Sequence, residues 1–360
     1  MDIETKIDLI KRSPTEEIIT EKELRKLLET KQYPKHYIGY EISGILHLGS
    51  LFIPGYKIRD LIEAGVECTF LLADWHSWIN KKLGGDMEKI KIGANYIQEA
   101  FKFFVGPKLK FVLGTELYHN NDDYWSRLIK INKTVTLDRV KRCLTIMGRK
   151  QTESIDFAQL IYPSLQANDI FELDVDIAHA GMDQRKAHIL AREVAQKMKW
   201  KVPVALHNHL VGGLIKPQAE GYDEDLKRDI EISAKMSKSK PSTIVSIHDS
   251  EEKIIEKFKK GWCPEKTIEN NPMLDMVKHL VFKENKVFEI ERSKKFGGNI
   301  TFENYDKFEK EFVSGKIHPQ DLKLSLARDI NNIIKPIREH FEKPANKKLL
   351  YVFKEVEITR

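Results

Sequence analysis

Short apolar runs alternate with helical stretches in the first third of the chain, and this alternation limits the possible folds more than any other feature. Strand-like runs at residues 37–40, 67–72 and 109–113 are separated by helical stretches near 51–64 and 87–104. Strands that alternate with helices favour a parallel sheet covered by helices, because parallel strands need crossover connections. The sequence therefore predicts an α/β fold.

The strand pattern is interrupted once and then resumes. A helical stretch over about 121–148, rich in Lys and Arg on one side, separates the first strands from strand-like runs at 173–178 and 202–206. Strands divided by a helical insertion are the organisation expected of a Rossmann-like nucleotide-binding fold. We also expect helical structure over 1–32 and an exposed loop over 217–229, where a glycine and many charges gather.

Helical patterning dominates the chain after about residue 249. One long stretch carries an apolar face that repeats every three or four residues, at Leu322, Leu326, Ile330, Ile333, Ile337 and Phe341. Residues 349–353 form a possible late strand with no evident partner. The sequence predicts an α/β domain over 1–248, with a Rossmann-like parallel sheet and a helical insertion at about 118–160, followed by an α-helical C-terminal domain over 249–360.

The composition describes a soluble, highly charged globular protein. Hydrophobic residues make up 41% and charged residues 32% of the 360 residues, which is enough chain for two cores. The net charge of +6 is compatible with a polyanionic partner without requiring one. Cys68, Cys143 and Cys263 lack metal-ligand spacing, and their odd number argues against a disulfide framework. Since the acidic N-terminus lacks an apolar targeting core, we expect a cytoplasmic protein without a membrane segment.

Two short segments far apart in the chain carry the most specific chemistry. Residues 47–50, His-Leu-Gly-Ser, follow the first expected strand, where Gly44 and Gly49 let a nucleotide approach the backbone and a helix N-terminus offers N–H groups to phosphate. Residues 235–239, Lys-Met-Ser-Lys-Ser, place two lysines where both can reach a polyphosphate and stabilise the charge on leaving pyrophosphate. Each segment alone is an ordinary loop, but their order and separation favour a shared role.

Together the two segments resemble the signature motifs of class I aminoacyl-tRNA synthetases, which use ATP to activate an amino acid and load it onto tRNA. The resemblance implies that His47, Lys235 and Lys238 are catalytic and that the loop over about 230–242 is mobile. Mg²⁺ would accompany ATP, with no protein-bound structural metal. Ser50 stands where many relatives have a second histidine, and its hydroxyl can still donate to a phosphate or ribose oxygen. The implied ATP-binding residues are Gly44, His47, Gly49, Ser50, Lys235, Met236, Ser237, Lys238 and Ser239.

A narrower resemblance, to archaeal and eukaryotic tyrosyl-tRNA synthetases, rests on a set of pocket positions: Tyr37, Gly39, Tyr162, Gln166, Asp169 and Gln184. It implies that Tyr37 and Asp169 bind the phenolic hydroxyl of tyrosine, that Gly39 leaves room beside it, and that the other three hold the ammonium group. Their spacing puts Tyr162, Gln166 and Asp169 on one face of a helix, and a buried carboxylate needs a donor such as a phenol. Singly, each residue has an ordinary structural explanation.

The same resemblance extends to tRNA recognition and assembly. Arg185 and Lys186 resemble residues near the acceptor end of tRNA(Tyr), whereas Phe296 would stack on an anticodon base with His318 and Asp321 beside it. Asp321 could also simply cap a helix. The family forms homodimers through the insertion, here about residues 118–160. Its apolar residues could serve either a dimer or the internal core: Leu128, Ile129, Ile131 and Val135.

We therefore expect a tyrosine–tRNA ligase, which makes tyrosyl-adenylate and pyrophosphate from L-tyrosine and ATP and then transfers tyrosine to the 3′ end of tRNA(Tyr). A tryptophanyl-tRNA synthetase shares the fold and both motifs, but an indole offers one donor in a different place from the pair Tyr37 and Asp169. A catalytically silent RNA-binding paralogue is disfavoured by the intact His47 and lysines. Another nucleotidyl transferase of the superfamily stays open. Trp75 puts a large side chain near the expected pocket.

Overall fold

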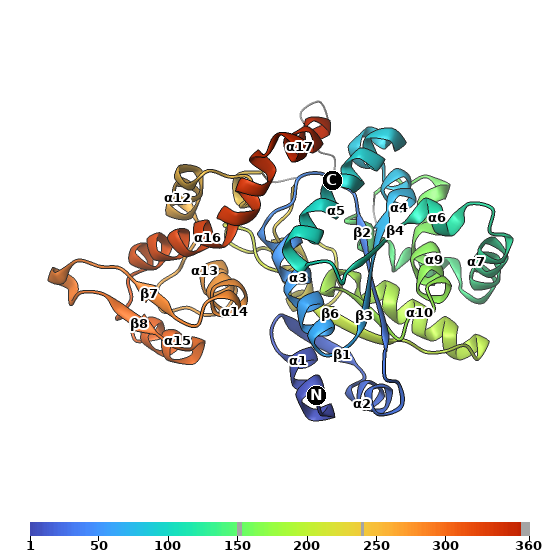
Figure 1. Cartoon of the computed structure of the whole chain (residues 1–360), viewed down its shortest axis with the longest axis horizontal. Coiled ribbons are helices and arrows are strands. Elements are labelled where there is room, and N and C mark those ends of the chain that lie inside the picture. The colour runs from blue at the N-terminus through green and yellow to red at the C-terminus, as the bar shows by residue number, and fades with distance from the viewer. Residues whose placement is uncertain (150–152, 239–240, 354–360) are drawn as a thin grey trace. The chain divides into compact units, whose positions relative to one another are not determined.

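The computed structural model describes residues 1–149, 153–238 and 241–353, which fall into two compact units (Figure 1). Among the described residues, the first unit comprises Met1–Gly44, Pro54–His209 and Lys348–Phe353. The second comprises Ile45–Ile53 and Leu210–Lys347. The short segment that carries His47 therefore belongs with the later part of the chain. The expected functional boundary near residue 249 stays a prediction.

A six-stranded sheet forms the centre of the first unit, with the strand order β1-β6-β5-β2-β3-β4. Five strands are parallel, and β1 runs antiparallel to β6 at one edge. This arrangement confirms the expected Rossmann-like parallel sheet. The strands are β1 (Thr15–Ile19), β2 (Lys35–Glu41), β3 (Glu67–Ala73), β4 (Lys110–Leu113), β5 (Ile177–Gly181) and β6 (Val204–Asn208).

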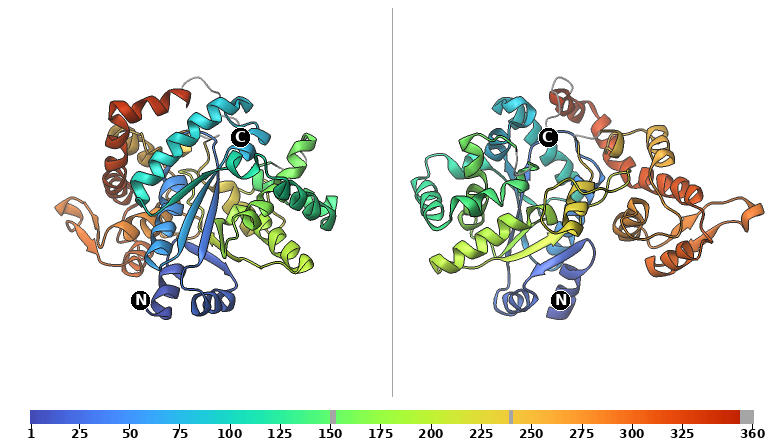
Figure 2. Two further views of the ribbon diagram at one scale, coloured as in Figure 1. Left: turned by 45° about the vertical axis from the view of Figure 1, so that its right-hand side comes forward. Right: turned by 180° about the vertical axis from the view of Figure 1, so that it is seen from behind.

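Helices cover both faces of this sheet (Figures 1 and 2). Connections from β2 to β4 run outward in one direction and the connection from β5 to β6 runs in the other, so right-handed crossovers place α5 and α10 on opposite faces. The helices are α1 (Ile3–Lys11), α2 (Glu21–Thr30), α4 (Asp74–Ile79), η1 (Lys82–Gly85), α5 (Met87–Val105), α6 (Gly114–Tyr118), α7 (Asp122–Thr134), α8 (Leu137–Lys141), η2 (Leu144–Met147), α9 (Phe157–Glu172), η3 (Met182–Gln184), α10 (Arg185–Met198) and η7 (Lys348–Phe353).

Helix α3 (Leu48–Glu63) begins in the second unit and continues into the first. Local sequence explains several helix starts. Thr20 begins α2 with a capping box to Glu23, and Asp156 begins α9 with a similar box to Gln159. Each box satisfies two main-chain N–H groups that the first turn leaves without a helical partner. The start of α9 is thereby fixed, and that helix carries most of the expected pocket residues.

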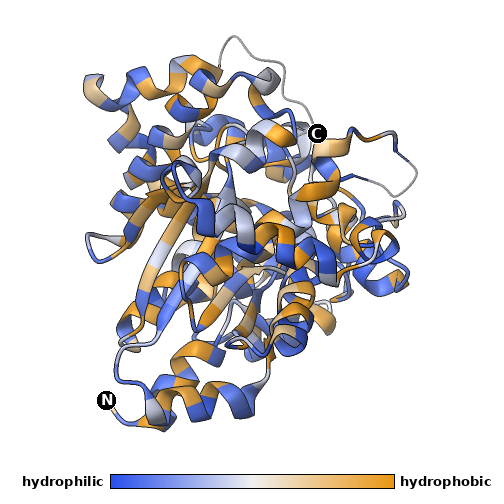
Figure 3. Ribbon diagram, turned by 90° about the vertical axis from the view of Figure 1, so that its right-hand side faces the viewer, coloured by the Kyte–Doolittle hydropathy of each residue, from blue (hydrophilic) through white to orange (hydrophobic). Residues whose placement is uncertain are grey.

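The second unit is mainly helical, as expected, with one added hairpin of strands β7 and β8. Helix α16 packs against α12 through its apolar face, in which Ile334 is fully buried and the expected Ile333 only half-buried. Figure 3 shows such apolar and polar stripes alternating along the helices. The elements of the second unit after α3 are α11 (Leu226–Ala234), η4 (Pro241–Thr243), α12 (Glu251–Lys260), α13 (Pro272–Met276), η5 (Val277–Val281), α14 (Phe282–Glu284), β7 (Phe288–Ile290), η6 (Lys294–Phe296), β8 (Ile300–Phe302), α15 (Tyr305–Val313), α16 (Pro319–Glu342) and α17 (Pro344–Lys347).

Several local predictions were wrong. The N-terminal region is not helical throughout, because Thr15–Ile19 pairs with β6 as an edge strand. The expected strand at 173–178 begins only at Ile177, since the chain before it ends α9. Residues 349–353 form the short helix η7 instead of a strand, and the ring of Phe353 packs edge-on against Tyr96 of α5 at 5.1 Å between ring centroids.

One helical prediction and one loop prediction were also wrong in part. The stretch 121–148 is broken into α7, α8 and η2, with Thr136 capping the second of these. The expected loop over 217–229 ends in helix α11, which Asp225 caps and which leads directly to Lys235. Within residues 1–149, 153–238 and 241–353, every helix is too short or too polar to span a lipid bilayer.

Candidate active site

Several polar residues of the first unit follow the ends of neighbouring strands of its sheet. The carboxyl ends of β2, β3 and β5 lie at the same edge because these strands are parallel. Glu41 ends β2, His76 follows β3 in α4, and Gln184 follows β5 in η3. Helix α9 adds Tyr162, Gln166 and Asp169 at the helical spacing that the sequence predicted.

Asp169 lies at the centre of a buried polar cluster, with an exposed fraction of 1%. Its Oδ1 accepts hydrogen bonds from the hydroxyl of Tyr124 at 2.7 Å and from the hydroxyl of Tyr118 at 3.1 Å. Its Oδ2 lies 3.5 Å from Nε2 of His76. Burial raises the pKa of Asp169 to about 8, although the hydrogen bonds from the two phenols oppose the rise.

Tyr37 lies on β2 within the apolar cluster that includes Ala167 and Ile170 of α9. Burial, and then the negative charge of Asp169, raise its pKa well above the usual value, so the phenol is neutral and its O–H can donate. A Cβ at Gly39 would lie 3.2 Å from the Tyr37 hydroxyl oxygen. Glycine at this position therefore leaves space around that hydroxyl.

Hydrogen-bond acceptors line the other part of the cluster. Oε1 of Glu41 accepts from Asn80 at 2.7 Å and from the hydroxyl of Tyr162 at 3.4 Å. Gln166 donates to Oε1 of Gln184 at 3.4 Å, and Gln184 donates to the main-chain oxygen of Ile146 at 2.8 Å. Carboxylate and amide oxygens in this number suit an ammonium group, which has three N–H donors.

The insertion contributes directly to this cluster. Residues of η2, with Leu144 and Met147 among them, pack around Tyr162. Trp75, which the sequence placed near the pocket, donates from its indole to Thr115 at 3.2 Å and packs edge-on against the ring of Tyr118 at 5.7 Å between centroids. It therefore supports one of the phenols that bind Asp169.

Sequence reasoning missed four residues of the cluster: Glu41, His76, Tyr118 and Tyr124. The two tyrosines precede Asp169 by 51 and 45 residues. Nothing in their local pattern separates them from core aromatics. Only a tertiary contact with Asp169, which a single sequence does not show, identifies them.

In the second unit, main-chain hydrogen bonds hold the segment around His47. Leu48 donates to the oxygen of Val245 at 3.0 Å, and Ile247 donates to the oxygen of Leu46 at 3.2 Å. Helix α3 begins at Leu48, so His47 lies at its N-terminus, as predicted. The amide of His47 donates to Oγ of Ser50 at 2.8 Å, and that hydroxyl donates to the His47 oxygen at 3.0 Å. Ser50 therefore stabilises this turn.

The lysine segment follows α11 in the same unit. Met236 is buried and donates to the oxygen of Val211 at 2.9 Å, while Lys235 pairs with Gly212. Burial, and then the positive charges of Lys238 and Lys235, lower the pKa of His47 to about 3, so its imidazole is neutral. Both ammonium groups thus act electrostatically on His47.

The remaining expected ATP-binding residues are two glycines and two serines. Gly44 has φ of +131°, a conformation that favours glycine. A Cβ at Gly49 would lie in ordinary contact with the His47 ring, at 3.6 Å. Ser237 is half-buried, and Ser239 lies outside the described residues.

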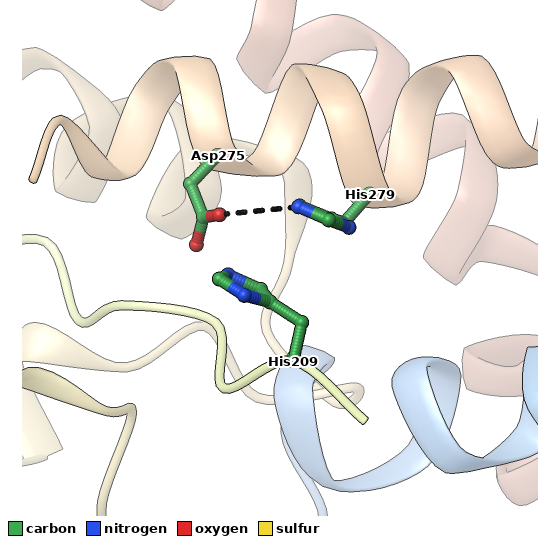
Figure 4. A group of neighbouring side chains, drawn as sticks. All are labelled: His209, Asp275 and His279. Atoms are coloured by element: carbon green, nitrogen blue, oxygen red, sulfur yellow. Dashed lines mark ion pairs between the residues drawn. The ribbon is translucent and has the colours of Figure 1, made fainter. Parts of the chain in front are cut away.

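The loop that pairs with Lys235 is held from α13. Asp275 accepts a hydrogen bond from the amide of Gly212 at 3.2 Å, and His279, one turn later, lies with Nε2 3.7 Å from Oδ1 of Asp275. Figure 4 shows these two side chains, together with His209, the last residue of the first unit before Leu210. Asp275 therefore supports the main chain beside Lys235.

The expected tRNA-binding residues lie in both units. Arg185 forms an ion pair with Glu17 at 2.8 Å, and Lys186 donates to Thr145 at 3.4 Å. The ring of Phe296 is 63% exposed in the turn between β7 and β8. His318 caps α16 through Nδ1, which accepts from the amide of Gln320 at 3.1 Å, and Asp321 lies in the first turn of that helix.

Comparisons with known proteins all identify the same family of tRNA synthetases. Residues 29–335 match the family described as tRNA synthetases class I (W and Y). The chain is 48% identical over 378 aligned positions, covering 100% of both chains, to a tyrosine–tRNA ligase of Thermococcus kodakarensis. The crystal structure of a tyrosyl-tRNA synthetase from Pyrococcus horikoshii, complexed with L-tyrosine, matches with a TM-score of 0.91 and 44% identity over 99% of this chain and 100% of that one.

A more distant solved structure shares the fold alone. The tryptophanyl-tRNA synthetase of Plasmodium falciparum is 16% identical, with a TM-score of 0.67 over 98% of this chain and 90% of that one. This chain and that tryptophanyl-tRNA synthetase therefore share one architecture.

Proposed function

This chain belongs to the class I tRNA synthetases for tryptophan and tyrosine and has the activity of a tyrosine–tRNA ligase, and from that premise we propose which of its residues carry each step. The buried cluster around Asp169 binds the amino acid. His47, Lys235 and Lys238 act on ATP. The substrates are L-tyrosine, ATP and tRNA(Tyr).

One observation carries the assignment of the amino-acid site. Asp169 is a buried carboxylate whose Oδ1 is already hydrogen-bonded, while its Oδ2 faces the cluster beside His76. The phenolic hydroxyl of tyrosine would donate to Oδ2 and accept from Tyr37. The ammonium group would donate to the acceptors near Tyr162, Gln166 and Gln184, with the carboxylate of Glu41 supplying opposite charge.

Activation proceeds by in-line displacement at the α-phosphorus of ATP. The carboxylate of tyrosine attacks, tyrosyl-adenylate forms and pyrophosphate leaves. Lys235 and Lys238 would stabilise the charge that develops on the leaving group, and the neutral imidazole of His47 would donate a hydrogen bond to a phosphate oxygen. Positioning and charge stabilisation suffice for this step, so no general base is required. Mg²⁺ bound to the phosphates would add positive charge.

Transfer to tRNA completes the reaction. A terminal ribose hydroxyl attacks the tyrosyl carbonyl, and AMP leaves. Arg185 and Lys186 would contact the acceptor end, and exposed Phe296 offers a ring on which an unpaired anticodon base can stack. His318 and Asp321 lie together at the start of α16, where both would contact the neighbourhood of that base.

We also propose that the insertion at about 118–160 forms a homodimer. Ile129 is 60% and Leu137 55% exposed on α7 and α8, whereas Leu128 and Ile131 are buried in the unit's own core. Exposed apolar residues of this size gain from a covering surface. The dimer would thus use Ile129 and Leu137 but not Leu128 and Ile131.

ATP–pyrophosphate exchange tests the proposed activation site. Tyrosine, tryptophan and phenylalanine are compared as the amino acid, without tRNA. We expect a far larger kcat/KM for exchange with tyrosine than with either of the other two amino acids. Exchange with tryptophan would overturn the pocket assignment and leave the fold unaffected, whereas failure with all three would overturn the assignment of the phosphate residues as well.

A further inference from the structure

Packing does not explain why Tyr118 and Tyr124 carry hydroxyl groups. Both rings are buried, and they lie 4.7 Å apart between centroids in a cluster with Leu128 and Leu165. A phenylalanine at either position would fill the same space and keep these ring contacts. The hydroxyls instead converge on one oxygen of Asp169, from the end of α6 and from α7.

Two donors on one oxygen fix the orientation of a carboxylate. With Oδ1 bound at 2.7 and 3.1 Å, rotation of the Asp169 carboxyl group would break one or both hydrogen bonds. Oδ2 is then held in a single direction. In the described part of the chain it accepts no hydrogen bond, although it is buried.

The surroundings of Oδ2 favour a hydroxyl as its partner. A buried carboxylate oxygen without a donor is costly, and Nε2 of His76, 3.5 Å away, also makes no hydrogen bond within the described residues. One hydroxyl could donate to Oδ2, and its oxygen could accept from the imidazole as well as from Tyr37. A phenol offers both functions, and a phenyl ring offers neither.

We propose that Tyr118 and Tyr124 are positioning residues that set the selectivity for tyrosine over phenylalanine, by occupying Oδ1 of Asp169 and directing Oδ2 toward the substrate hydroxyl. The inference rests on the proposed amino-acid site. A purely structural role for the two tyrosines would affect stability without changing the ratio between the two substrates.

The test uses the full-length Tyr118→Phe, Tyr124→Phe and double variants. Tyr96→Phe is the matched control, because Tyr96 is a buried tyrosine of the same unit whose ring packs against η7. For each protein, kcat and KM are measured by ATP–pyrophosphate exchange with tyrosine and with phenylalanine, and thermal unfolding is recorded.

We expect the ratio of kcat/KM for tyrosine over phenylalanine to fall about 10-fold in each single variant and about 100-fold in the double variant, the scale of lost hydrogen bonds to a charged group. The loss should lie in KM for tyrosine, with kcat and KM for ATP little changed, since the contact is made in the ground state. The Tyr96→Phe ratio should match that of the unsubstituted protein.

An unchanged ratio in a folded double variant overturns the positioning role. If Tyr124→Phe fails to fold, Tyr118→Phe decides by itself: an unchanged ratio in that variant likewise overturns the positioning role. Failure of the unsubstituted protein to activate tyrosine would instead overturn the proposed site itself, so the two failures are distinguishable.

Discussion

The proposed tyrosine pocket and the proposed phosphate-binding segments are built in different ways. In the pocket, side chains hold side chains: two phenols bind Asp169, and Asn80 binds Glu41. Around His47 and Lys235, main-chain hydrogen bonds hold the segments, and the lysine side chains are only half-buried. Selectivity between similar amino acids requires fixed polar partners, whereas a polyphosphate requires charges that can follow it.

The largest effect that would sharpen this comparison is expected from Lys238→Ala. Loss of one cation that stabilises the leaving pyrophosphate should lower the exchange rate about 10²- to 10³-fold. Tyrosine affinity should stay within about twofold, because the pocket side chains belong to the other unit. Exchange kinetics and equilibrium binding of tyrosine give the two quantities.

Lys227→Ala is the control for that substitution. Lys227 is an exposed lysine on α11 of the same unit. It should keep normal exchange. An equal loss in both variants would mean that general positive charge, and not the position of Lys238, is responsible.

Asp169→Asn should have the next largest effect, and it should act on the use of tyrosine and not on the use of ATP. The amide cannot ionise, and the ionised carboxylate is the form that would best accept the substrate hydroxyl, so kcat/KM for tyrosine at pH 9 should fall about 10²-fold while KM for ATP changes little. A parallel rise in the KM for ATP would break the separation between the two regions.

The effect of pH on KM for tyrosine should be smaller than the effects of these two substitutions. Burial raises the pKa of Asp169 to about 8, so the acid is largely protonated at pH 7 and ionised at pH 9. Because the ionised form accepts better, KM for tyrosine should fall up to about 10-fold between these values. The groups that face this carboxyl are Tyr37, Tyr118, Tyr124, His76, Asp74 and Glu172.

Asp169→Asn controls for titration of the substrate itself. The variant should lose the part of the pH dependence that belongs to the protein. A pH profile identical in both proteins would assign the whole effect to free tyrosine.

The smallest effect on either region is expected from Ile129→Asp. The added charge should shift the dimer toward the monomer in light scattering, with tyrosine binding almost unchanged. Ile92→Asp, at another exposed isoleucine, should stay dimeric. A monomeric unsubstituted protein would rule out the dimer proposal.

Much of the fold was predictable from local sequence patterns. The helical spacing of Tyr162, Gln166 and Asp169, and the glycines and lysines of the two motifs, follow rules that act over a few residues. The strands β2, β3, β4 and β6 were found from apolar runs. The fold therefore follows from sequence, and the position of the proposed pocket rests on the same local rules.

Long-range partners were not predictable in the same way. Glu17 lies in strand β1, where the sequence predicted helical structure. Its carboxylate binds Arg185, which is 168 residues away in the chain. The phenols that bind Asp169 look like core aromatics until the fold brings them together. Tertiary pairing overrides local propensity at such positions.

Equilibrium binding of tyrosine and phenylalanine to the nucleotide-free protein, repeated with a nonhydrolysable ATP analogue, tests the central claim most directly. If the pocket around Asp169 is selective by itself, tyrosine will bind and phenylalanine will not, with the same preference in both conditions. Selectivity that appears only with the ATP analogue would contradict the account, because amino-acid recognition would then depend on the phosphate segments.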